Sequence, residues 1–276
     1  MLKYLELNDL SALSELGFVD EETLETGQGS RHFCIPAGDG CFMGFRYYDI
    51  NKPLKGKERV YIYVSPDKFC LVCDNKKVKN IFSRIPEDSG GFTALALFYQ
   101  LLTEKDVDTL EKLEDIITKL EDKLITSNRL DNSAGDAVIK QRRALLKIKR
   151  YYSQLNIITG DLLAVCDNMT DKERIALKAI DRRFAHLLNS VMNLREYTTQ
   201  VREAYQAQID IEQNQIMKIF TVLTAVFSPL SLIVGWYGMN FAMPEYTWKF
   251  GYLYVIILSI IVAVFCIFIF NRKKWY

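Results

Sequence analysis

The sequence predicts an α+β domain with a helical hairpin and a long stalk helix, followed by two transmembrane α-helices. Three observations predict this class. Residues 31–85 alternate short β-rich runs with turn residues, which is typical of a small sheet. From residue 106 onward apolar side chains recur every three or four positions, as they do in helices. Charged residues make up 25% of the chain, yet residues 219–270 contain only Glu245 and Lys249, so a soluble part gives way to a membrane part.

The predicted sheet lies in the first domain, residues 1–102. Its β-rich runs are separated by Ala-Gly-Asp-Gly, Ser-Pro-Asp and Asp-Asn-Lys-Lys, which are turn sequences. A largely antiparallel sheet is therefore expected, with a helix over residues 92–102 covering it. The predicted strands are residues 31–35, 41–48, 59–64, 68–73 and 78–82.

The second domain, residues 103–170, is predicted to be a helical hairpin. Val107, Leu110 and Leu113 begin an apolar series at helical spacing that continues to residue 124. Residues 127–135 break this helix, and a second helix is expected over residues 136–165. Two helices joined by a short connection pack as an antiparallel pair.

The stalk, residues 171–218, begins at a capping box formed by Thr170 and Glu173. No Gly or Pro follows until Pro229, so one helix is expected to run from the stalk into the membrane. A helix over residues 171–237 would be roughly 100 Å long. Such a helix is too long to be buried by one small chain, and neighbouring copies are the expected cover, with the hairpin of the same chain supplying part of it.

Two uncharged stretches, residues 219–237 and 251–270, are each long enough to cross a hydrocarbon core of ~30 Å. Residues 238–250 form the external loop between them, and residues 271–276 form a basic tail. Lys218, Arg272, Lys273 and Lys274 flank the spans on one side, so the positive-inside rule predicts that both termini are cytoplasmic.

The first span carries a stripe of small and polar residues at helical spacing, whereas the second is apolar nearly all round. Such a stripe has two interpretations. Small and hydroxyl residues often serve only the packing of membrane helices. They can also line an aqueous pore. The stripe consists of Asn214, Met217, Thr221, Thr224, Ser228, Ser231 and Gly235.

Composition excludes several classes of function. The net charge of +1 and the scattered basic residues give no footprint for nucleic acid. The six cysteines show no disulfide framework, which fits a reducing cytosol. Cys70 and Cys73 form a CxxC, but apolar residues separate them and no second pair follows, so a strand is favoured over a metal site. Enzymatic activity is not expected, because the chain has no nucleophile with a base and no phosphate-binding glycine loop.

A distinctive motif follows the first span. Tyr237-Gly238-Met239-Asn240-Phe241 stands at the outer end of that span, followed by Met243-Pro244-Glu245 and, after the second span, by a basic tail. These residues resemble those of the CorA family of magnesium channels. The close match covers about residues 214–276. The resemblance implies a funnel-shaped homopentamer in which copies of the first span surround a pore.

The resemblance also implies roles for individual residues. Gly238, Met239 and Asn240 would form a selectivity filter that recognises hydrated Mg²⁺ through neutral oxygens, since Mg²⁺ gives up water reluctantly. Glu245 in the outer loop would concentrate cations. In the family, bulky aliphatic residues form a hydrophobic gate in the pore. This chain departs from that pattern, because it has Phe220 at one gate position and the small Ser228 at the other. The implied pore-lining positions are Asn214, Phe220, Thr224, Ser228, Ser231 and Gly235.

A regulatory Mg²⁺ between subunits is a further implication of the resemblance. The resemblance places this regulatory site near residues 179–183, where Asp181 is the only carboxylate. The alternative interpretation is that Asp181 belongs to a solvated helix face and binds no metal. The N-terminal domain is also shorter than is usual in the family. Mg²⁺ is thus expected as the transported ion and as a regulatory ligand, and no organic cofactor is expected.

The favoured function is influx of Mg²⁺, with Co²⁺ and Ni²⁺ as further candidate ions, through a two-span protein of a prokaryotic plasma membrane. The expected partners are divalent ions, copies of the chain and the lipid bilayer. One alternative is a zinc transporter of the same superfamily, although His32 and His186 both lie outside the spans. The other is a membrane-anchored scaffold, which would not need a polar stripe.

Overall fold

The computed structural model describes residues 1–126, 132–239 and 248–272. The chain divides into two compact units, Met1–Glu203 and Ala204–Tyr276. The boundary between them falls inside one helix, α7 (Asp171–Tyr237), which contributes its first part to one unit and its last part to the other.

The first unit contains a five-stranded sheet with the order β1-β5-β4-β3-β2. Strand β1 pairs with β5 in parallel, and all other neighbours are antiparallel. The prediction of a largely antiparallel sheet is therefore confirmed. The strands are β1 (Leu2–Leu5), β2 (Phe33–Ala37), β3 (Gly40–Tyr47), β4 (Glu58–Val64) and β5 (Phe69–Val72).

Helices cover both faces of this sheet, and alternate residues of each strand supply the two halves of the core. On one face Phe42, Tyr61 and Tyr63 pack with Leu13 and Phe18 from the short elements near the N-terminus, Leu13 on a helix and Phe18 on the connection that follows it. Those elements are a 3₁₀ helix (Leu7–Asp9), α1 (Ala12–Glu15) and α2 (Glu21–Gly29).

The other face is covered by α4 (Gly91–Leu102), as predicted for residues 92–102. The ring of Tyr99 on α4 lies 6.4 Å from that of Phe45 on β3 and 5.2 Å from that of Phe184 on α7. All three side chains are buried. Aromatic packing thus joins the sheet to the start of the stalk.

The predicted strand over residues 78–82 is wrong, because this segment is helix α3 (Lys76–Phe82). The side chain of Asn75 accepts hydrogen bonds from the backbone N–H groups of Lys77 (2.8 Å) and Val78 (3.1 Å), which caps a helix. The Asp-Asn-Lys-Lys sequence is therefore a helix start and not a hairpin turn. The fifth strand is β1, which the sequence analysis did not predict.

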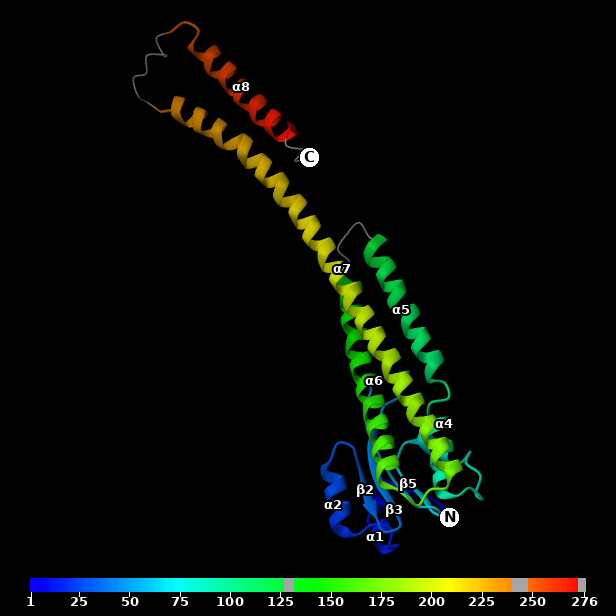
Figure 1. Ribbon diagram of the computed structural model, residues 1–276. Coiled ribbons are helices and arrows are strands. Elements are labelled where there is room, and N and C mark those ends of the chain that lie inside the picture. Colours follow the sequence, from blue (N-terminus) through cyan, green and yellow to red (C-terminus); the bar gives the residue numbers. More distant parts are fainter. Residues whose placement is uncertain (127–131, 240–247, 273–276) are drawn as a thin grey trace. The chain divides into compact units, whose positions relative to one another are not determined.

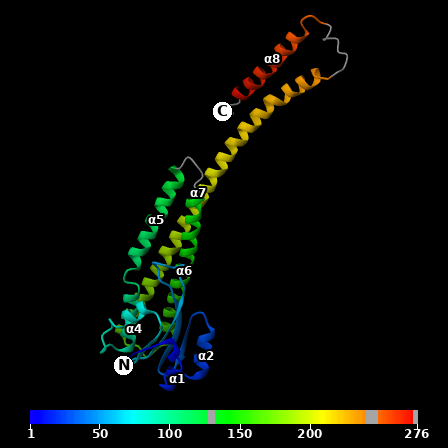
Figure 2. The same cartoon turned by 180° about the vertical axis from the view of Figure 1, so that it is seen from behind.

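Three long helices complete the first unit. Helix α5 (Asp106–Thr126) and helix α6 (Asn132–Val165) pack against each other, and the first part of α7 runs beside them (Figures 1 and 2). The capping box is confirmed, since the Glu173 carboxylate accepts hydrogen bonds from the N–H (3.0 Å) and hydroxyl (2.7 Å) of Thr170. Of the predicted break at residues 127–135, residues 127–131 lie outside the described residues. Residues 132–135 are helical, because α6 begins at Asn132, four residues earlier than predicted.

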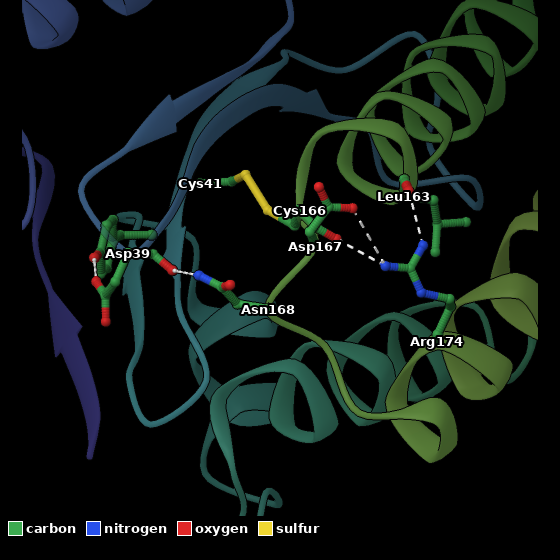
Figure 3. Close-up of a disulfide and its surroundings, with 8 residues drawn as sticks. Asp39, Cys41, Leu163, Cys166, Asp167, Asn168 and Arg174 are labelled. Atoms are coloured by element: carbon green, nitrogen blue, oxygen red, sulfur yellow. Dashed lines mark hydrogen bonds and ion pairs between the residues drawn. A yellow bond between two sulfur atoms is a disulfide. The ribbon is translucent and has the colours of Figure 1, made fainter.

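A disulfide between Cys41 and Cys166 joins the start of β3 to the connection between α6 and α7 (Figure 3). The same connection is held by Arg174, whose guanidinium donates to the carbonyls of Leu163 (3.4 Å) and Cys166 (3.2 Å). Asn168 donates to the Asp39 carbonyl at 3.5 Å. The sequence analysis predicted no such bridge, because the two cysteines are 125 residues apart and have no motif.

Candidate functional site

The candidate site lies in the second unit. Within residues 1–126, 132–239 and 248–272, two helices are long and apolar enough to cross a membrane, and they are α7, through its last part, and α8 (Gly251–Arg272). All members of the predicted polar stripe on α7, and Phe220 from the implied pore-lining positions, are exposed in the single chain. Even the large side chains Met217 and Phe220 are 62% and 58% exposed. The exposed set is Asn214, Met217, Phe220, Thr221, Thr224, Ser228, Ser231 and Gly235.

A second row of residues on α7 is shielded, and it lies on the opposite side of the helix. Val222 is only 8% exposed, and the half-buried residues after it recur every three or four positions. At 3.6 residues per turn this row is roughly 160° around the helix from the polar stripe. The shielded row consists of Val222, Ala225, Val226, Pro229, Leu230, Ile233 and Tyr237.

Helix α8 carries a matching half-buried row, and it runs back along the last part of α7 (Figures 1 and 2). Because α8 is the other helix of this unit, the two shielded rows face each other and the polar stripe faces away from α8. The α8 row consists of Val255, Leu258, Ser259, Val262, Ala263, Cys266 and Phe270.

Two of the hydroxyl groups of the stripe are oriented by the helix itself. Thr221 donates to the carbonyl of Met217 and Thr224 donates to that of Phe220, both at 2.8 Å. Since a hydroxyl has one hydrogen, its oxygen can then only accept from groups beside the helix. The stripe therefore offers neutral acceptors, which suit the hydrogens of a hydrated cation.

Pro229 lies in the shielded row and not in the stripe, and α7 continues through it. Proline has no N–H, so the carbonyl of Ala225, four residues earlier, lacks its usual helical donor. This unpaired carbonyl belongs to the half-buried side of the helix, where a neighbouring helix can shield it.

The C-terminal end of the stripe is a tight helix end at Gly238. Its N–H donates to the Val234 carbonyl at 2.9 Å, and the N–H of Met239 donates to the Trp236 carbonyl at 3.3 Å. A Cβ built on Gly238 would lie 2.9 Å from the Val234 carbonyl oxygen, closer than side chains normally approach. Glycine therefore fits this turn without the crowding that a Cβ would bring. Asn240 and Glu245, predicted for the filter and the outer loop, lie outside the described residues.

Aromatic side chains gather at the same end of both spans, a feature that the sequence analysis did not single out. Trp236 is 60% exposed and Tyr252 is 84% exposed, and the rings of Trp248 and Tyr254 are 5.9 Å apart. Trp and Tyr concentrate where a membrane meets water, because their rings are apolar and their N–H or O–H groups are polar. Their position near the ends of both hydrophobic stretches could have been read from the sequence.

Asp181, the predicted regulatory residue, lies on the stalk part of α7 in the first unit. It is half-buried, and its carboxylate accepts a hydrogen bond from the Asn156 amide of α6 at 2.8 Å. Among the described residues no three His, Cys, Asp or Glu side chains come together in a way that could hold a metal ion. Asp181 therefore has a structural hydrogen-bond partner and belongs to no such cluster in the part of the chain that the structure describes.

The Cys70–Cys73 pair has the environment of buried strand residues. Cys70 is 1% exposed and Cys73 is fully buried. Burial raises the pKa of the Cys70 thiol to about 12 and that of Cys73 to about 11. Thiols with such pKa values stay protonated at neutral pH, whereas a metal or redox site needs thiolates.

Comparison with known proteins agrees with these features. The sequence model of one family, described as "CorA-like Mg2+ transporter protein", matches residues 1–273. The "Cobalt/magnesium transport protein CorA" of Thermotoga maritima is 25% identical over 246 residues, which are 85% of this chain and 70% of that protein. The "Magnesium transport protein CorA" of Wolinella succinogenes is 30% identical over 199 residues, 67% of this chain and 58% of that protein.

The fold is also similar to a solved structure. The CorA magnesium transporter from Methanocaldococcus jannaschii superposes with a TM-score of 0.77, covering 98% of this chain and 88% of that chain at 20% sequence identity. The α+β domain, the long helix and the two apolar C-terminal helices of this chain therefore form a known architecture.

Proposed function

Since this chain belongs to the family of CorA-like Mg²⁺ transporter proteins, we propose that it conducts Mg²⁺ across a membrane through a pore lined by α7 of several copies. The observation that carries the proposal is the polar stripe of α7, which is exposed and faces away from α8. Two of its hydroxyls already donate within the helix, so they offer only acceptors. A cation pathway needs such a surface, and a membrane tether does not.

Copies of the chain would supply the remaining walls of the pore. A polar stripe facing lipid is unfavourable, and small and hydroxyl residues promote close contact between membrane helices. A ring of α7 helices turns every stripe inward and leaves the apolar α8 helices toward lipid. Five copies are the number that the resemblance to the family implies, and the soluble units would then form the funnel.

The proposed filter is at Gly238, Met239 and Asn240. Mg²⁺ loses its water shell reluctantly, so a filter of carbonyl and carboxamide oxygens can pass the ion with its water in place. The tight helix end at Gly238 would hold these oxygens at the pore mouth. Co²⁺ and Ni²⁺ are similar enough in charge and hydration to be further substrates, and Glu245 would raise the local cation concentration.

The direction of transport follows from the proposed orientation. Two spans return the chain to its starting side, and Lys218 and Arg272 flank the spans at the end that would be cytoplasmic. A membrane potential negative inside drives cations inward by ~2.3 kcal/mol per charge per 100 mV. The proposal assigns no chemical reaction to the chain.

The proposal is tested by Mg²⁺ entry into liposomes that contain the purified chain and a Mg²⁺-sensitive dye. The native chain is expected to admit Mg²⁺, and Asn240→Ala is expected to abolish the flux or make it unselective. Asn193→Ala, which removes an exposed amide in the first unit, is the matched control and should behave like the native chain. Absence of flux for Mg²⁺ and Co²⁺ from well-assembled native protein would favour the scaffold.

A further inference from the structure

A cavity of about 490 Å³ in the first unit, remote in sequence from the spans, has no role in the proposed function. It lies where the loop between β3 and β4 meets the helices α5 and α6. Cavities that bind small molecules have volumes of this order, commonly 300–1,000 Å³. The size alone therefore permits a ligand as large as a nucleotide.

The lining of this cavity is strongly basic. Among the described residues that line it there are four lysines and no carboxylate. The structure also shows no ion pair for these lysines within its described residues. Asp108 and Asp115 are neighbours of Lys112 on α5 but do not line the cavity. The four lysines are Lys52, Lys55, Lys112 and Lys140.

Apolar side chains lie between these charges. Leu54 and Ile116 line the cavity and are both 41% exposed, and Ala144 contributes a buried surface beside them. Exposed aliphatic residues among lysines give a surface that is favourable for a ligand with both an anionic and an apolar part.

The loop between β3 and β4, which forms one wall of the cavity, is held in place by buried side chains and a hydrogen bond. Ile50 is 6% exposed and Pro53 is buried, so two side chains fix the loop in the core. The Lys147 ammonium of α6 donates to the Leu54 carbonyl at 3.4 Å. Asp49, the nearest carboxylate in the loop, is already paired with Lys77 at 2.5 Å. The wall is therefore built before any ligand arrives.

We propose that this cavity binds a phosphorylated small molecule of nucleotide size, with its phosphates on the lysines and its apolar part on Leu54 and Ile116. Lysine ammonium groups bind phosphate as point charges. A single terminal phosphate carries about −1.5 to −2 at pH 7, so a di- or triphosphate is the class whose charge approaches that of four lysines. Asn51, Thr109 and Gln141 on the same lining supply neutral hydrogen-bonding groups.

Isothermal titration of the full-length chain in detergent with metal-free ATP tests the proposal independently of transport. Saturable binding at one site per chain is expected, and it should weaken as salt is added. The double variant Lys112→Gln/Lys140→Gln should weaken ATP binding by about tenfold or more, because it removes two charge-assisted contacts. The control Lys119→Gln/Lys123→Gln removes the same charge from exposed positions of α5 that do not line the cavity, and it should bind ATP like the native chain.

Two outcomes would overturn the proposal. One is the absence of saturable binding of ATP or ADP to the native chain. The other is an equal loss of affinity in the two double variants, which would mean that ATP responds only to total charge. Inorganic triphosphate tests the contact with Leu54 and Ile116, because it lacks the apolar part of ATP. It should bind more weakly than ATP, and equal affinity would overturn the role given to these two residues.

Discussion

At the scale of single residues, Thr221 and Thr224 show how an apolar helix can offer a path to a cation. Each hydroxyl donates to a carbonyl one turn earlier at 2.8 Å. This bond uses the only hydrogen of the hydroxyl group, so the polar side chain has a hydrogen-bond partner inside a membrane span. In the proposed pore, the remaining neutral oxygen would accept hydrogen bonds from the water around an ion and attract the ion without holding it as a carboxylate would.

Gly238→Ala tests whether the tight end of α7 is required. The added Cβ would lie 2.9 Å from the backbone oxygen of Val234, so the turn must shift. A displacement of about 1 Å at a functional constellation can be severe, and we expect liposome Mg²⁺ flux to fall by roughly tenfold or more. Gly160→Ala on α6, where a Cβ meets nothing within 4 Å, is the control and should retain flux. Equal flux in both variants would show that Gly238 is not needed for its shape.

Asp106 is expected to make the stability of the first unit depend on pH. Burial raises its pKa from 3.8 to about 6, although the Tyr152 hydroxyl, 2.9 Å away, and the Arg183 charge oppose this shift. A carboxyl with a raised folded-state pKa binds its proton more tightly when folded. Its contribution is therefore stabilising at low pH and is lost as the pH rises through about 6.

The measurement is thermal unfolding of the full chain at several pH values between about 4 and 7. Asp106→Asn should remove a component of the pH dependence that is on the order of 2–3 kcal/mol across this window. Asp108→Asn, an exposed carboxylate on the same helix, should leave the native pH dependence in place. If the profiles of the two variants coincided, the assignment to Asp106 would be wrong.

At the scale of elements, the sequence predicted those whose signals are local. The Thr170–Glu173 box marks the start of α7, and the lack of Gly and Pro before Pro229 predicts that the helix runs on into the span. The helix then continues through Pro229 to Tyr237. Segment 78–82 was assigned to a strand because Asn75 can start a turn or cap a helix, and only the fold shows that it caps α3. Strand β1 was missed because four residues carry little periodicity, and its pairing with β5 is a long-range contact.

The candidate site was also predictable only where its signals are local in the sequence. The exposed stripe of α7 could be predicted, because helical spacing puts its members on one face. That this face is opposite to the row shielded by α8 depends on the packing of two helices, which spacing alone does not give. The lysine-lined cavity was not predicted at all, because its walls come from a loop and two helices that are far apart in the sequence.

The disulfide between Cys41 and Cys166 is expected to stabilise the junction of the sheet with the α6–α7 connection. Closing a loop of 125 residues restricts the unfolded chain, and native disulfides typically contribute about 2–5 kcal/mol. Thermal unfolding of the non-reduced protein should therefore occur at a lower temperature in Cys166→Ser than in the native chain. Cys34→Ser, which removes a free cysteine, is the control, and free thiols at both Cys41 and Cys166 in non-reduced protein would contradict the pairing.

At the scale of the whole molecule, the polar stripe needs a cover that one chain does not supply. One chain leaves the stripe exposed while α8 shields the other side of α7. Several copies arranged around an axis would enclose the stripes and leave the apolar surfaces toward lipid, so the chain should purify as an oligomer. Light scattering of the detergent-solubilised protein should give a protein mass five times that of the chain, and a monomer would contradict the proposed pore.

The central claim is that the stripe of α7 lines the path of the ion, and cysteine accessibility tests it most directly. In a Cys266→Ser background, Ser231→Cys places a thiol on the stripe and Ile257→Cys places one on α8, each about one and a half turns from its end of the span. A charged, membrane-impermeant thiol reagent should block liposome Mg²⁺ flux through Ser231→Cys and leave Ile257→Cys unaffected. Flux through Ser231→Cys that persists after the reagent has modified the thiol would contradict the account.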